Sequence, residues 1–81
     1  SGELFIDKIS TRSALQIIRS CSKPFPGAYF QDEQKIRVWD AEICKVKHSE
    51  LISNKNSFIK KDILYLRLRD GWLRSNNFEF C

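Results

Sequence analysis

The sequence predicts a mainly β domain, a small antiparallel β-barrel or sandwich with one N-terminal helix. The chain has 81 residues, which suits one domain around a single apolar core. One amphipathic stretch near residues 11–21 comes first, and short apolar runs separated by turn residues follow across residues 28–80. Short strands at intervals of about 8–12 residues are typical of small barrels and sandwiches.

The predicted helix has a start signal, an apolar stripe and a stop signal. Ser10-Thr11 offers an N-cap. The apolar residues then recur at helical spacing, as Ala14, Ile17, Ile18 and Cys21, with Leu15 beside them. Pro24 disfavours helix at the residue before it, so we expect the helix to end by Ser22.

The strands are expected in the following order. A short strand at residues 4–6 precedes the helix. After the corner formed by Pro24, Pro26 and Gly27, five strands are expected, at 28–31, 35–47, 58–59, 63–68 and 72–80, the last with a bulge at Asn76-Asn77. The apolar parity of the long strand changes near Asp40-Ala41, which predicts a β-bulge. Asp70-Gly71 predicts a type I′ hairpin turn with positive φ at both central residues.

Composition narrows the functional classes. The three cysteines have no C-x-x-C spacing, which argues against a disulfide framework and a zinc site and favours a cytoplasmic protein. Neither a membrane-spanning run nor a signal-peptide pattern is present. The net charge is +4, which is compatible with a polyanionic partner. No residues form a catalytic pattern, and His48 in a polar loop is expected to be solvated.

One group of motifs carries a family resemblance. The motifs are Ser13-Ala14, Ile17-Ile18-Arg19, Pro24-Phe25-Pro26-Gly27-Ala28-Tyr29-Phe30, Ile36-x-Val38-Trp39-x-Ala41-Glu42 and Asp70-Gly71-Trp72-Leu73. Together they resemble the carboxy-terminal domain of methionyl-tRNA formyltransferases and related formyltransferases. The resemblance runs in register over nearly the whole chain and is densest from Ile17 to Glu42.

The resemblance implies an open, OB-like Greek-key barrel that forms one domain over residues 1–81. It implies a partner outside this sequence, the N-terminal catalytic domain, which binds 10-formyltetrahydrofolate and supplies the catalytic residues. No cofactor, metal or catalytic residue is therefore expected in this domain. We expect an excised, inactive fragment whose parent is a formyltransferase.

Three roles are open for such a domain. The first is contact with tRNA through the basic residues Lys35, Arg37, Lys45, Lys47, Arg67, Arg69 and Arg74. The alternative reading is a solvated face whose charges partly pair with Glu42, Asp40 and Glu79. The second is a structural or dimerisation domain of an enzyme that formylates nucleotide-linked amino sugars, with Phe78, Phe80 or Trp72 exposed as an apolar patch. The third is a self-standing OB-like module that binds single-stranded nucleic acid.

Two departures from the family pattern keep the amino-sugar role open beside the tRNA role. Asn54-Lys55-Asn56-Ser57 stands where the family usually has a Pro-Gly turn. The sequence also ends at Cys81 without the basic tail that is often seen in the members acting on tRNA.

Overall fold

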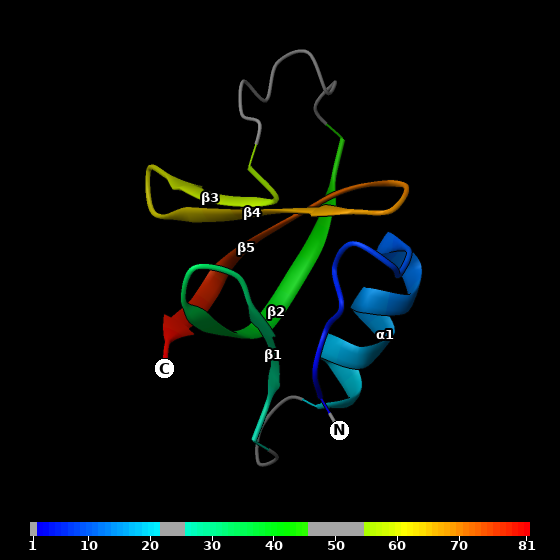
Figure 1. Cartoon of the computed structure of the whole chain (residues 1–81), viewed down its shortest axis with the longest axis horizontal. Coiled ribbons are helices and arrows are strands. Elements are labelled where there is room, and N and C mark those ends of the chain that lie inside the picture. Colours follow the sequence, from blue (N-terminus) through cyan, green and yellow to red (C-terminus); the bar gives the residue numbers. More distant parts are fainter. Residues whose placement is uncertain (1, 22–25, 46–54) are drawn as a thin grey trace.

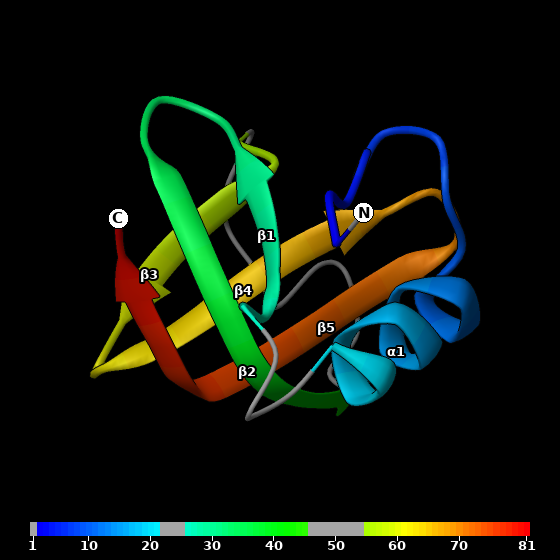
Figure 2. The same cartoon turned by 90° about the horizontal axis from the view of Figure 1, so that it is seen from below.

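The computed structural model describes residues 2–21, 26–45 and 55–81. The elements follow in the order α1 (Thr11–Ser20), β1 (Ala28–Gln31), β2 (Lys35–Cys44), β3 (Ser57–Lys60), β4 (Ile63–Leu68) and β5 (Gly71–Phe80). All five strands form one antiparallel sheet in the spatial order β1-β2-β5-β4-β3. The sheet is strongly twisted, and α1 packs against β2 and β5 (Figures 1 and 2).

The strands form the expected mainly β architecture with one helix. The two edge strands, β1 and β3, are not paired with each other, so the sheet is not closed into a complete barrel. Within the described ranges, no helix has the length and apolar character needed to cross a membrane.

The helix forms as the sequence predicts, with a small difference at its end. The Ser10 hydroxyl accepts a hydrogen bond from the backbone N–H of Ser13, the expected N-cap. The helix ends at Ser20 with Cys21 as its C-cap, within a residue of the predicted boundary. Ala14, Leu15 and Ile18 are buried against the sheet, where they join the main core.

The core lies on the face of the sheet that carries the helix. Its largest fully buried side chains come from every strand except β3 and from α1: Phe30, Ile18, Leu64, Leu66, Leu73 and Val38. The pattern of β4 shows how a strand contributes to this core, because its residues alternate strictly between buried leucines and half-buried residues. Period-two alternation places one side-chain set inside and the other on the outer face.

The predicted bulge is present in the middle of the pairing between β2 and β5. The register between the two strands shifts between Val38 and Asp40 and again between Asp40 and Glu42. The hydroxyl of Ser75, a buried polar residue, donates to the carbonyl of Asp40 and accepts from the backbone N–H of Asn77 at 3.1 Å. One side chain therefore satisfies backbone groups on both strands that the bulge removes from the regular ladder.

Residues 4–6 do not form the expected strand. The backbones of Leu4 and Gly2 bond to Tyr29 at 2.7 and 2.9 Å, which gives one isolated parallel bridge, Glu3–Tyr29. The chain then turns at once, because the N–H groups of Lys8 and Ile9 both bond to the carbonyl of Phe5. The apolar run is explained by burial of alternate residues, not by strand pairing.

The type I′ turn was predicted at the wrong hairpin. Among the described residues, positive φ occurs at Gly27, Lys61 and Asp62, and not at Asp70 or Gly71. Lys61 and Asp62, with φ of 52° and 64°, are the two-residue loop between β3 and β4, the geometry that type I′ requires. In the β4–β5 turn, Asp70 instead caps the N-terminus of the helix.

That cap joins residues far apart in the sequence. The backbone N–H of Thr11, at the start of α1, donates to Oδ1 of Asp70 at 2.7 Å. This hydrogen bond is the main cause that lowers the pKa of Asp70 below its ordinary value. A carboxylate at a helix N-terminus is also favoured by the helix dipole.

We expect the Asp70 cap to make folding stability depend on pH. Because the folded-state pKa is lowered, the stabilisation is fully present above the ordinary pKa of about 3.8 and is lost as the pH falls through the folded value. Urea unfolding of the wild type and of Asp70→Asn, measured from pH 7 down to pH 3, checks this. The wild-type advantage at pH 7 should shrink below pH 4, and a difference that stays constant over this range would contradict the assignment.

Candidate nucleic-acid interface

The Pro-Gly corner is closed by side chains of β2. Gly27 has φ of 91°, and a Cβ there would lie 2.8 Å from Cζ3 of Trp39. Arg37 donates to the carbonyl of Pro26 and, at 3.3 Å, to that of Gly27. The Trp39 indole N–H in turn donates to Oε1 of Glu79 on β5 at 2.8 Å. Pro24, the other proline of the corner, lies outside the described residues.

Lys35 and Arg37 also face the ring of Tyr29. The Lys35 Nζ lies 4.4 Å and the Arg37 Cζ 5.9 Å from the ring centroid. The Tyr29 hydroxyl donates to Glu3 at 3.3 Å, and its pKa is raised, first by burial and then by the Glu3 carboxylate. Both cations of this surface, which we call the corner surface (Tyr29, Lys35, Arg37 and Trp39), thus contact groups within the chain.

A second cluster lies on the outer face of β3, β4 and β5. The Phe58 and Tyr65 rings stack with centroids 4.9 Å apart, and Phe58 meets Trp72 edge-on at 5.7 Å. Trp72 is buried beside Cys44. The guanidinium of Arg67 lies over the Trp72 ring, 5.0 Å from its centroid. The prediction that Trp72 is part of an exposed apolar patch is therefore wrong, because these neighbours cover it.

Two more predicted cations lie beside this cluster. Lys45 and Arg74 line a shallow hollow together with Glu42, Ile43 and Cys44. The strand register brings these residues together, because Arg74 on β5 lies opposite Glu42 on β2 and opposite Tyr65 on β4. The Arg74 Nε bonds Oε1 of Glu42 at 2.6 Å, and this hydrogen bond is the main cause that raises the pKa of Arg74. We call Lys45, Arg67 and Arg74 the basic cluster.

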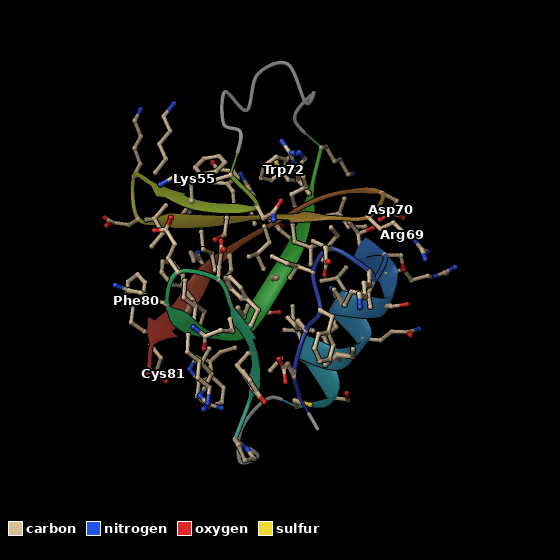
Figure 3. The ribbon with its side chains drawn as sticks, viewed as in Figure 1. Lys55, Arg69, Asp70, Trp72, Phe80 and Cys81 are labelled. Carbon is tan, nitrogen blue, oxygen red and sulfur yellow. The ribbon has the colours of Figure 1, made fainter. Side chains whose placement is uncertain are left out.

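Arg69 lies apart from the other cations. It sits in the β4–β5 turn, where its backbone N–H bonds to Ile9 at 2.9 Å and its Nη1 lies 3.5 Å from the carbonyl of Lys8. Figure 3 shows Arg69 and Asp70 at the side of the molecule opposite Phe80 and Cys81. Because Cys81 bonds to the carbonyl of Lys35, Lys35 and Arg69 lie on opposite sides.

Six of the seven predicted cations lie within the described residues, and they divide among three places. Lys35 and Arg37 belong to the corner surface, and Arg69 lies at the helix cap. Lys45 and Arg74 line one hollow, and Arg67 lies over the neighbouring Trp72 ring. Lys47 and His48 lie outside the described residues. Of the acidic residues expected to pair with the basic face, Glu42 bonds to Arg74, whereas Glu79 accepts from the indole of Trp39.

The open side of the sheet forms a groove. It has a volume of about 540 Å³ and runs between the β1–β2 turn and β3. Its apolar lining residues are Ile36, Phe58, Ile59, Leu64 and Phe80. Phe80 and Ile59 are 54% and 42% exposed, whereas Phe78 is half-buried. Of the three predicted patch aromatics, Phe80 is thus the exposed one, and Ile59, which no sequence motif indicated, joins it.

In the described part of the chain, no three His, Cys, Asp or Glu side chains come together in a group that could hold a metal ion. The cysteines differ in environment, with Cys44 buried, Cys21 half-buried and Cys81 exposed. Compared with protein-family models and with curated proteins, the chain matches none.

Proposed function

We propose that this chain is the non-catalytic C-terminal domain of a 10-formyltetrahydrofolate-dependent formyltransferase resembling the methionyl-tRNA enzymes, with an OB-like open barrel that assists tRNA binding. The sequence resemblance carries the proposal, and the contacts of its motif residues support it. Gly27 and Trp39 lie against each other, and Asp70 caps the helix at Thr11. These contacts give the motif residues structural roles.

The basic cluster is the surface that fits tRNA best. Lys45 and Arg74 line one hollow, and Arg67 lies on the same outer face of the sheet beside the stacked aromatic rings. Cations along one sheet face track a phosphate backbone without reading bases. The Glu42 carboxylate at Arg74 lowers the net charge of the surface, so the expected binding is weak and independent of sequence.

We expect the chain to bind bulk tRNA with an affinity that falls as salt rises. The slope of log affinity against log salt should be about 0.7–0.9 per phosphate neutralised. Lys45→Glu should weaken binding about three- to tenfold at low salt and reduce the slope by about one, because it removes an exposed cation and adds a repelling charge. Fluorescence anisotropy across a salt series measures both quantities.

The matched control is Arg12→Glu on the helix. It makes the same charge change at an exposed residue outside the basic cluster. If both variants weaken binding equally, only net charge matters and the basic cluster is not the site. If the wild type fails to bind tRNA even at low salt, the tRNA role is rejected.

One observation favours a second candidate, a structural or dimerisation domain of a nucleotide-linked amino-sugar formyltransferase. Phe80 and Ile59 expose apolar surface at the groove, and exposed apolar patches often mark protein contacts. A chain that binds no tRNA but associates through this groove would favour the second candidate over the first.

A further inference from the structure

Two stacked rings lie on the outer face of the sheet. The strand register places Phe58 on β3 opposite Tyr65 on β4, and both point to the face opposite the buried leucines of β4. Their centroids lie 4.9 Å apart, and the ring planes differ by 15°. The two residues, which we call the ring pair, are half-buried, so part of their surface is open to solvent. Figure 3 shows Trp72, against which the ring pair packs, on the opposite side of β4 from α1.

Cations lie on three sides of the ring pair. Arg74 on β5 lies directly opposite Tyr65. Arg67 follows Tyr65 by two positions on β4, and so lies on the same face about 7 Å along the strand. Lys60 follows Phe58 in the same way on β3. Lys60 was not among the predicted cations, because the predicted strand ended at residue 59.

The charge of this face favours a polyanionic partner. Two carboxylates, Asp40 and Glu42, line hollows together with Arg74. Lys61 and Asp62 in the adjoining turn carry opposite charges. The face keeps a net positive charge because four cations lie on it or beside it: Lys45, Lys60, Arg67 and Arg74.

We propose that the ring pair stacks an unpaired base of an RNA strand, while the surrounding cations contact the flanking phosphates. The inference rests on the tRNA role proposed above, and it names the part of the RNA that this face holds, a loop or a single-stranded end. Positive charge alone suits any polyanion. Aromatic rings between cations suit a strand whose bases are free to leave their own stack. Stacking tolerates every base, so binding stays independent of sequence.

Fluorescence anisotropy with two labelled RNA strands of about ten nucleotides tests the proposal. One strand has a mixed sequence that does not pair with itself. The other has the same backbone with abasic positions through its centre, so the phosphate charge is kept and the bases are missing. At low salt, the chain should bind the strand with bases at least about fivefold more tightly. Equal affinity for the two strands would overturn the proposal.

Variants at Tyr65 place the stacking on the ring pair. Tyr65→Leu should weaken binding of the strand with bases about fivefold or more and leave binding of the abasic strand unchanged. Tyr65→Phe keeps the ring and should bind both strands like the wild type. Tyr29→Leu is the matched control, because Tyr29 is another half-buried tyrosine beside two cations, on the corner surface. Equal losses from Tyr29→Leu and Tyr65→Leu would contradict the assignment, and circular dichroism verifies that each variant is folded.

Lys60→Glu separates phosphate contact from stacking. It should weaken binding of both strands by the same factor, about three- to tenfold at low salt, and reduce the salt slope by about one. Unchanged binding of both strands would reject the arrangement of cations around the ring pair.

The outcomes distinguish this inference from the proposed function. A chain that binds tRNA but holds both strands equally rejects the stacking alone. A chain that prefers the strand with bases but does not bind tRNA rejects the tRNA role alone.

Discussion

Gly27→Ala is expected to lower the free energy of unfolding by about 2–4 kcal/mol. Two costs combine at this corner. The φ of 91° is disfavoured for any residue with a Cβ, and the added methyl would lie 2.8 Å from the Trp39 ring and 3.1 Å from the Arg37 side chain. Trp39 is held by its bond to Glu79, so it cannot move away freely. Urea denaturation followed by tryptophan fluorescence measures the loss.

Gly71→Ala is the matched control for this prediction. Gly71 has no positive φ, and a Cβ there would meet only the Thr11 methyl at an ordinary 3.5 Å. We expect a change within about 1 kcal/mol, because alanine restricts the unfolded chain and this offsets any small cost in the folded state. Equal losses at the two glycines would show that the corner geometry is not the cause.

Ser75→Ala is expected to cost about 2–3 kcal/mol. The hydroxyl is buried and bonds to the Asp40 carbonyl and the Asn77 N–H. Without it, two backbone groups at the bulge lose a partner in a region that water does not reach. Thermal and urea unfolding give the loss, and amide exchange at Asn77 reports whether the bulge itself opens.

Ser20→Ala controls for loss of a hydroxyl as such. Ser20 is exposed on the helix and bonds to the carbonyl of Ile17 at 3.2 Å. Water replaces this partner, and alanine favours helix, so the expected change is within about 0.5 kcal/mol. If Ser75→Ala proves equally mild, the bulge does not depend on the hydroxyl.

Features encoded by local pattern were predictable from the sequence. The cap at Ser10 and the helical apolar stripe placed α1 to within a residue. The parity change at Asp40-Ala41 located the bulge because buried positions keep facing the core when the strand gains a residue. Alternating leucines likewise identified β4.

Features that depend on distant partners were not predictable. Asp70-Gly71 has the composition of a type I′ turn, but the Asp70 carboxylate is engaged by Thr11, 59 positions earlier. Lys61-Asp62, without glycine, takes that geometry because the β3–β4 register leaves only two residues to connect the strands.

Prediction of the candidate site was limited in the same way, because its contacts also join residues that are distant in the sequence. Sequence parity placed Arg67 on an outward position, and Glu42, which bonds to Arg74, was among the acidic residues expected to pair with the basic face. The corner carbonyls that accept from Arg37 and the Trp72 ring beside Arg67 were not predicted. Only register and bending decide which cations form a surface, and neither is visible in a single sequence.

The sheet order has a consequence for biosynthesis. β5, which follows the other four strands in the sequence, lies in the middle of the sheet and joins the β1–β2 hairpin to the β3–β4 hairpin. A nascent chain that still holds residues 71–80 inside the ribosome has two hairpins with no strand between them, and two-stranded hairpins alone are barely stable. Translation must therefore carry this last strand out of the exit tunnel before the domain can fold, and until then the apolar faces of both hairpins are open to chaperones.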